Sequence, residues 1–208
     1  MPNKKIGIKY SGSPIHFTYN NVKVAWKNLP YLIKSILTKD TLKIDGWSFY
    51  YDYYSLYKRQ NKVWKKSYLS KTNIKGKIIL DIGAGCGETA KFFLEHGAKH
   101  IIAVENNPDA LPFLKLNAKN HPLTVIGQPF NTKMLEIPHD FMKMDIEGYE
   151  ILLLIENVLP HYKKECIINV HGNYIFDEFI NKFGFEDLTK IKRIYPLLSG
   201  GIVYRGPT

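Results

Sequence analysis

The segment "KIILDIGAGCGETA" (residues 77–90) decides the fold. Residues 77–82 form a short apolar run, which is typical of a strand buried in a parallel sheet. Gly83, Gly85 and Gly87 follow at once, and helical spacing of apolar residues begins after them. Glycine lets the backbone turn sharply and approach a ligand closely, while the start of a helix offers unpaired N–H groups. The segment therefore predicts a strand, a ligand-binding loop and a helix.

An acidic residue stands at the end of the next expected strand, "HIIAVE" (100–105). Glu105 lies 22 residues after Gly83, where a carboxylate accepts hydrogen bonds from ribose hydroxyls. The glycine spacing is G-x-G-x-G, and Glu88 occupies the place where a dinucleotide fingerprint would have its third glycine. Together these features predict an adenosine-bearing cofactor that is held without a pyrophosphate.

Strand and helix patterns alternate from residue 77 onward. The expected strands are 77–82, 100–105, 123–127, 140–145, 166–171, 185–191 and 199–205. The expected helices are 88–97, 107–120, 149–159 and 174–184. Such alternation predicts right-handed βαβ units in an α/β, doubly wound, seven-stranded and mostly parallel Rossmann-like sheet with helices on both faces. No helix separates the last two strands, so one of them should run antiparallel and close one edge of the sheet.

The N-terminal third differs from the remainder in charge. Residues 1–76 hold 15 Lys and Arg against three acids, and half of the 28 aromatic residues. A basic, aromatic surface suits nucleic acid or other anions, but the chain has 26 Lys and only three Arg, whereas phosphate recognition favours Arg. We expect helices around 22–37 and 52–70, and strands within 43–54. The interpretation is a basic extension that could recognise the acceptor, followed by a cofactor-binding domain over 77–208.

Two classes of protein are disfavoured by composition. No apolar run approaches the ~18 residues that a membrane span needs, and the first ten residues lack the apolar part of a secretory signal. Cys86 and Cys166 have no metal-ligand spacing and are expected to be reduced thiols. A cytoplasmic protein is the expectation, and the sequence predicts no oligomeric state.

The motifs resemble a known family. "LDIGAGCGETA" with "AVENNP" resembles motif I and the following acidic position of class I S-adenosylmethionine (SAM)-dependent methyltransferases. With "KMDIEGYE" and "INVH", residues 77–205 more narrowly resemble the FkbM methyltransferases, which implies the seven-stranded fold, SAM as cofactor and oxygen acceptors. The connection over 127–139 is shorter than in many relatives. The residues expected in the SAM site are Asp81, Gly83, Ala84, Gly85, Gly87, Glu105, Asn106, Gln128 and Asp145.

The stretch "FMKMDIEGYEILLLI" (141–155) carries the candidate catalytic acids. Asp145 ends the fourth strand, beside the first strand and at the switch in strand order, where ligands bind. Asp145 or Glu147 could orient or deprotonate an acceptor hydroxyl, and His171 at the end of the fifth strand is a third candidate base. For Glu147 an equally good interpretation is that it caps the start of a helix. For His171 the alternative is a polar residue at the end of a strand that has no catalytic role.

The remaining residues of this stretch have weaker interpretations. We expect Glu150 to be a surface acid in the first turn of a helix whose buried stripe is Ile151, Leu152, Leu154, Ile155 and Val158. Tyr149 could pack on the acceptor or on the core. A divalent cation held by Asp145, Glu147 and His171 is a minor alternative, and no metal is predicted.

Three functions follow from these residues. The leading hypothesis is a SAM-dependent methyltransferase of FkbM type that acts on oxygen of a small molecule, sugar or lipid head group. The second is an RNA methyltransferase that uses residues 1–76 to bind RNA. The third is a protein that binds SAM without catalysis, as a sensor or scaffold.

Overall fold

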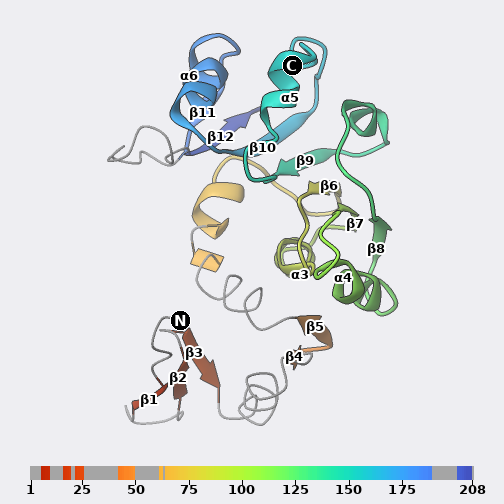
Figure 1. Cartoon of the computed structure of the whole chain (residues 1–208), viewed down its shortest axis with the longest axis vertical. Helices are drawn as coiled ribbons and strands as arrows, with labels where there is room; N and C mark the ends of the chain where they lie inside the picture. The colour runs from red at the N-terminus through yellow and green to blue at the C-terminus, as the bar shows by residue number, and fades with distance from the viewer. Residues whose placement is uncertain are drawn as a thin grey trace.

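The computed structural model describes residues 6–9, 16–19, 22–25, 42–49, 61–62, 64–188 and 201–207. Its main feature is a seven-stranded sheet with the strand order β11-β12-β10-β9-β6-β7-β8 (Figure 1). The strands are β6 (Ile78–Ile82), β7 (His100–Val104), β8 (Leu123–Ile126), β9 (Phe141–Met144), β10 (Glu165–Val170), β11 (Glu186–Asp187) and β12 (Gly201–Arg205). The predicted α/β fold with seven strands is confirmed.

The pairing of the strands brings two expected ligand-binding loops together. β6 pairs in parallel with β7 on one side and with β9 on the other, so the strand order reverses at β6. The loops that follow β6 and β9 therefore leave the sheet at neighbouring points of the same edge. At the far side, β12 runs antiparallel to both β10 and β11, which confirms the predicted antiparallel edge.

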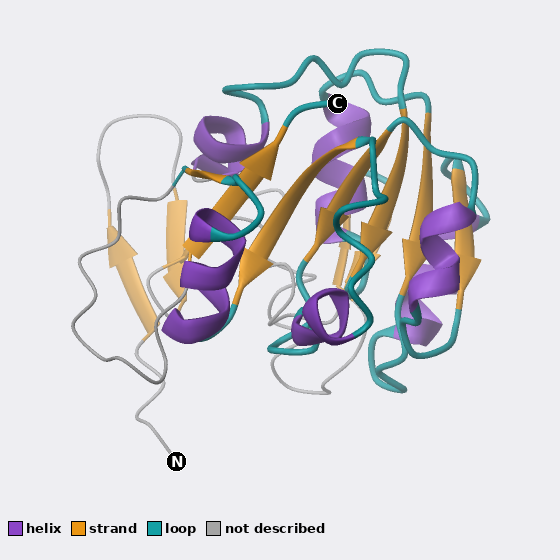
Figure 2. Ribbon diagram, turned by 90° about the horizontal axis from the view of Figure 1, so that it is seen from above, coloured by secondary structure: helices purple, strands orange, loops and turns teal. Residues whose placement is uncertain are grey.

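Helices cover both faces of the sheet (Figure 2). They are α3 (Glu88–Glu95), α4 (Leu111–Ala118), α5 (Ile151–Ile155) and α6 (Asn173–Asn181), with a 3₁₀ turn η2 (Thr132–Glu136). Successive strand residues point to opposite faces. Ile79 accordingly packs in the cluster of α3 and α4, whereas Leu80 packs in the cluster of α6. β6 is thus buried on both faces, as its mainly apolar sequence predicted.

The N-terminal third holds two small sheets in its described parts. One contains β1 (Ile6–Lys9), β2 (His16–Tyr19) and β3 (Val22–Ala25), and the other contains β4 (Leu42–Ile44) and β5 (Trp47–Phe49). The predicted helix over 22–37 is wrong at its start, because "VKVA" alternates with the period of a strand and pairs antiparallel with β2. The strands expected within 43–54 are confirmed at β4 and β5. Residues 26–37 lie outside the described part.

Aromatic residues of the N-terminal third join the core of the sheet. Trp47, Phe49, Trp64 and Tyr68 are buried in the same hydrophobic cluster as Phe92 of α3. The ring of Trp64 lies edge-on to that of Phe92, with centroids 5.7 Å apart. The helix predicted around 52–70 is present at residues 64–68. A domain boundary at residue 76 stays a prediction, but these four residues pack in the same core as residues of the seven-stranded sheet.

Helix α5 differs from the expectation in length and in orientation. It begins at Ile151 because the preceding turn holds Glu147 and Gly148 at φ of 54° and 104°. Leu153 is its buried residue, and Leu154 and Val158 of the predicted stripe are partly buried against the same core. Ile151 and Ile155 are 37% and 70% exposed, so the predicted stripe is wrong at these two positions. Residues three apart share a face of a helix, and the inward face here carries both Glu150 and Leu153.

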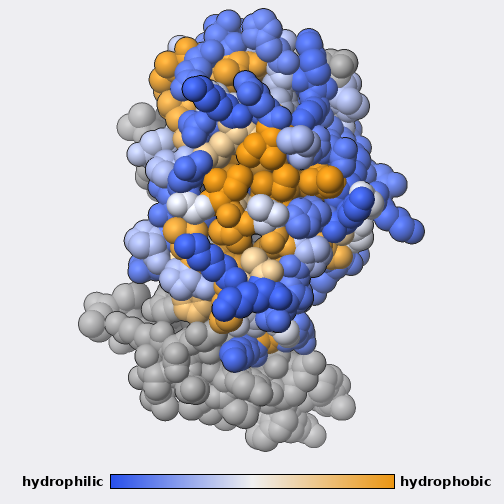
Figure 3. All heavy atoms as spheres, turned by 90° about the vertical axis from the view of Figure 1, so that its right-hand side faces the viewer, coloured by the Kyte–Doolittle hydropathy of each residue, from blue (hydrophilic) through white to orange (hydrophobic). Residues whose placement is uncertain are grey.

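Two expectations from composition concern membrane spans and the two cysteines. Within the described residues, no helix is long and apolar enough to cross a membrane. Cys86 and Cys166 are both buried, and neither forms a disulfide bond among the residues that the structure describes. From the side that lies at the right of Figure 1, an apolar area is bordered by hydrophilic side chains (Figure 3).

Asn117 joins the β4–β5 hairpin to the glycine loop. Its Oδ1 accepts a hydrogen bond from Ser48 N at 2.7 Å, and its Nδ2 donates to Ser48 O and Cys86 O, each at 2.8 Å. We expect Asn117→Ala to lower the free energy of unfolding by about 2–4 kcal/mol in urea titrations, because buried backbone groups lose their partners. Asn120→Ala, at an exposed position, is the control and should cost under ~0.5 kcal/mol. Equal losses for both variants would contradict this role.

Candidate active site

A cavity of about 510 Å³ opens at the carboxyl ends of β6, β7 and β9. It collects most of the residues that the sequence predicts. Those that line it are Gly83, Gly85, Glu105, Asn106, Gln128, Asp145 and Glu147. Four others do not line it, namely Asp81, Ala84, Gly87 and His171. The lining carries amides, carboxylates and one ammonium group, so the cavity suits a ligand with several polar groups.

The glycine loop is tied to both neighbouring strands. Gly83 N and Ala84 N donate to Val104 O at 2.9 and 3.1 Å, which fastens the loop to β7. On the other side, a Cβ at Gly83 would lie 1.8 Å from the carbonyl oxygen of Asp145. No side chain fits there, so glycine is required for the loops after β6 and β9 to come together.

Glu105 fixes the second side of the loop. Its carboxylate accepts hydrogen bonds from Gly85 N at 2.7 Å, Asn106 N at 2.8 Å and Asn107 N at 2.7 Å. Each carboxylate oxygen can accept more than one hydrogen bond, so capacity remains for hydroxyls of a ligand in the cavity. Glu105 thus both positions the loop and presents negative charge beside it, which agrees with the predicted place of a ribose.

Asp81 lies beneath the loop in a buried ion pair that sequence analysis did not identify. Its Oδ1 is 3.0 Å from Lys143 Nζ, and its Oδ2 accepts a hydrogen bond from the Thr89 hydroxyl. Burial raises the pKa of Asp81, and Lys143 and Thr89 oppose this effect. Burial lowers the pKa of Lys143, but Asp81 and Asp145 more than offset it, so that pKa is raised overall. Asp81 therefore supports the site from below.

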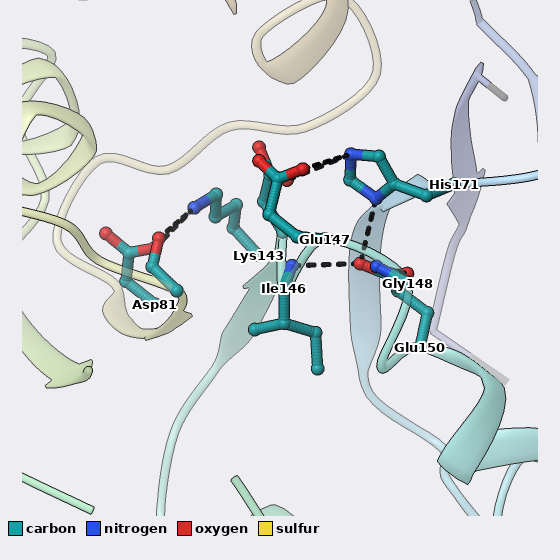
Figure 4. A network of polar contacts seen from close by, with 9 residues as sticks. Asp81, Lys143, Ile146, Glu147, Gly148, Glu150 and His171 are labelled. Carbon is teal, nitrogen blue, oxygen red and sulfur yellow. Dashed lines mark hydrogen bonds and ion pairs between the residues drawn. The ribbon is translucent and has the colours of Figure 1, made fainter. Parts of the chain in front are cut away.

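Three titratable side chains gather where β9 and β10 end, and Figure 4 shows two of them, Glu147 and His171, facing each other. Asp145 follows β9, and its Oδ1 lies 3.7 Å from Nε2 of His171, which follows β10. Glu147 Oε2 approaches the same nitrogen at 3.5 Å, and its side chain is 87% exposed. The structure thus brings the three predicted catalytic residues together, with Asp145 and Glu147 on the cavity and His171 behind them.

Glu150 is not the surface acid that the sequence predicts. Its side chain is fully buried, and it accepts hydrogen bonds from Ile146 N at 2.8 Å and Gly148 N at 2.9 Å. It also accepts from His171 Nδ1 at 3.2 Å (Figure 4). The expectation fails because the donors belong to a turn whose positive φ values bring these N–H groups round to Glu150. Glu150 holds the shape of the loop that carries Asp145 and Glu147.

The environment of His171 changes its proton affinity. The hydrogen bond to Glu150 raises the pKa of His171, burial lowers it, and the carboxylates of Asp145 and Glu147 raise it further. The net direction is upward, so the imidazolium form persists to higher pH than for a free histidine. Asp145 lines the cavity and His171 does not, so Asp145 is the better placed base.

A cation could also bind at this cluster. One ligand atom from each of Asp145, Glu150 and His171 lies within 4.8 Å of the other two. This set replaces Glu147 of the predicted alternative with Glu150. Because Glu150 already accepts two backbone hydrogen bonds, its oxygens are poorly available to a metal, and the geometry favours a loop-holding role.

Further residues of the cavity wall were not predicted. Trp64 from the N-terminal third lines the cavity, as do Glu88 and Lys143. Of the two predicted alternatives for Tyr149, packing on the core is wrong, because this residue is 68% exposed and lines the cavity. The sequence offered a signal only for Glu88, through its place directly after the glycines. Trp64 and Lys143 reach the cavity through tertiary packing.

Comparison with known proteins finds methyltransferases that are similar in sequence or in fold. No family model matches the sequence. Protein arginine N-methyltransferase 1 from Saccharomyces cerevisiae is 30% identical over 154 residues, which are 66% of this chain and 43% of that protein. The enzyme of the same name from Oryza sativa subsp. indica is 35% identical over 104 residues, 48% of this chain and 25% of that protein. The chain spans less than half the length of these curated relatives.

Solved structures show the same architecture. The yhhF protein from Escherichia coli, which is named as a methyltransferase, superposes with a TM-score of 0.52 at 16% identity, over 72% of this chain and 86% of that chain. Precorrin-6y C5,15-methyltransferase from Geobacter metallireducens gives a TM-score of 0.49 at 19% identity, over 71% and 85% of the two chains. The superposition on the yhhF protein shows that the chain has the class I methyltransferase fold.

The contact between Glu150 and His171 leads to a measurable prediction. Glu150→Gln should lower the pKa of His171 relative to wild type, because the charged partner of the ring is lost. Titration of the histidine ring protons by NMR measures this value. Glu156→Gln, at the other end of α5, is the control and should leave the pKa of His171 where it is. An unchanged midpoint in Glu150→Gln would show that the contact is not made in solution.

Proposed function

We propose that this chain, a distant relative of the protein arginine methyltransferases with the class I methyltransferase fold, transfers a methyl group from SAM. The observation that carries the proposal is the Glu105 carboxylate, bonded to Gly85 N at the edge of a cavity beside the glycine loop. This arrangement offers acceptors to ribose hydroxyls and close backbone approach to the rest of the cofactor.

Each part of the cofactor has a proposed place along the cavity lining. In the proposal, Gly83 and Gly85 face the methionyl part, Glu105 accepts from the ribose and Gln128 lies near the adenine. Asp145 stands at the methyl end, beside the acceptor. The reaction is an in-line displacement that breaks the bond from sulfur to methyl and forms a bond to the acceptor. Its rate depends chiefly on alignment.

The acceptor end of the cavity is acidic. The side chain of Glu147 is 87% exposed, and Asp145 Oδ1 is buried with no hydrogen-bond partner among the described residues. These groups suit a cationic or hydrogen-donating nitrogen, such as a guanidinium or amine, and the relatives named above are arginine methyltransferases. Asp145 would take the proton that the nitrogen loses on methylation. We therefore propose a nitrogen acceptor ahead of an oxygen acceptor.

Oxygen acceptors are the second candidate. The FkbM resemblance rests on "KMDIEGYE" and "INVH", and Asp145 could deprotonate a hydroxyl in the same position. RNA is a weaker candidate, because the exposed carboxylate of Glu147 repels phosphates. Of the 15 basic residues of the N-terminal third that favoured RNA, seven lie outside the described part of the chain.

Calorimetric titration tests the cofactor. Wild type should bind SAM, and Glu105→Gln should weaken binding by about 10–100-fold, because a charged hydrogen-bond acceptor is replaced by an amide. Asp109→Asn, an exposed acid on the neighbouring turn, is the control and should bind as wild type. If folded wild type fails to bind at millimolar SAM, the proposed function is wrong.

A transfer assay tests the acceptor class. With methyl-labelled SAM, wild type should methylate arginine-containing peptides more than hydroxyl acceptors or RNA. Asp145→Asn should reduce turnover by about 10²–10⁴-fold, the range typical of a lost general base. Asp177→Asn, on α6 and away from the cavity lining, should retain activity. Label in hydroxyl compounds alone would reverse the order of the two acceptor classes.

A further inference from the structure

Glu88 is a buried acid that the proposed reaction does not yet use. It is the first residue of α3, is only 5% exposed and lines the cavity directly after the glycine loop. Its Oε2 is buried and finds no hydrogen-bond partner in the part of the chain that the structure describes. A buried carboxylate without a full set of partners is costly, so its retention at a cavity wall points to a ligand.

The glycine loop makes room for this carboxyl group. A Cβ at Gly85 would lie 2.4 Å from Glu88 Oε1, and Gly85 has a φ of +57°. The side chain of Glu88 thus fills the space beside Gly85 in which another residue would place its own side chain. The carboxyl group of Glu88 therefore lies beside Gly85 of the glycine loop, and both residues line the cavity.

The charges that face Glu88 leave an excess of negative groups. Lys143 comes from β9, Asp81 from β6 and Glu105 from the end of β7. Lys143 is already paired with Asp81. Burial raises the pKa of Glu88 to about 8, Lys143 opposes this, and Asp81 and Glu105 add to it. Near neutral pH the carboxyl group is therefore mostly protonated until a cation comes beside it.

We propose that Glu88 recognises the α-ammonium group of the methionyl part of SAM, an inference that rests on the proposed function. In the proposed function, Glu105 binds the ribose and Asp145 lies beside the methyl group. The methionyl part then faces the remaining wall of Gly83, Gly85 and Glu88. The ammonium group donates to Glu88 Oε2. S-Adenosylhomocysteine (SAH) carries the same ammonium group but no sulfonium, and 5′-methylthioadenosine carries neither.

These three ligands separate the alternatives by calorimetry at pH 7. Glu88→Gln should weaken SAM and SAH alike, by about 10–100-fold, and leave 5′-methylthioadenosine within about twofold of wild type. Glu95→Gln, an exposed acid at the other end of α3, should bind all three as wild type does. Loss of SAM affinity alone would assign Glu88 to the sulfonium and overturn the proposal. Equal losses for all three ligands would assign it a structural role and do the same.

Proton release gives a second readout. The raised pKa means that the free protein holds a proton on Glu88 at pH 7, and pairing with the ammonium ionises it. Wild type should release close to one proton on binding SAH, measured in buffers of different ionisation enthalpy, and its affinity should rise from pH 6 to pH 7.5. Glu88→Gln should release none from this site. Identical release by wild type and variant would overturn the proposal.

The outcomes also distinguish this inference from the proposed function. Failure of wild type to bind both SAM and SAH refutes the function, whereas normal binding by a folded Glu88→Gln refutes only the role of Glu88. Glutamine resembles the protonated form that prevails near pH 7, so the variant should fold, and circular dichroism checks this. Glu88→Asp withdraws the charge by one methylene and should give a smaller loss for SAM and SAH.

Discussion

The buried ion pair between Lys143 and Asp81 is the interaction on which the site depends. Lys143 Nζ lies 3.0 Å from Asp81 Oδ1 and donates to Gly83 O at 2.8 Å, so one side chain joins β9, β6 and the glycine loop. Removing two charges from water is costly, and such a pair persists only where further hydrogen bonds satisfy it. Here the Thr89 hydroxyl and the loop carbonyl supply them.

The charges around the cavity follow from that pair. Because Lys143 is committed to Asp81, the carboxyl groups of Glu88, Glu105 and Asp145 face the cavity without a cation of their own among the described lining residues. The carboxylates of Glu105 and Asp145 therefore make the wall negative at the ends of β7 and β9. SAM carries a sulfonium and an ammonium against one carboxylate, so its net positive charge matches this wall.

Much of the fold could be predicted because strands and helices depend on local patterns. The apolar run of β6, the glycines after it and Glu105 predicted the cofactor side of the cavity in the right order along the chain. Helix α5 was predicted less well. Five consecutive apolar residues from Ile151 to Ile155 give no clear face, so its rotation depended on what Glu150 and Leu153 contact. The helix expected over 22–37 failed at β3 because its partner strand supplies the pairing.

By itself, the sequence determined the βαβ order, the glycine loop and the acids at the strand ends, since each depends on neighbours along the chain. Only the tertiary structure decided which acids belong to the surface. Glu150 became a buried support for the Asp145 loop, and Lys143 became the partner of Asp81. Trp64, from the N-terminal third, packs on Phe92 of α3 and lines the cavity. These roles depend on contacts between residues far apart in sequence or on the path of a turn, and neither is visible in residue spacing.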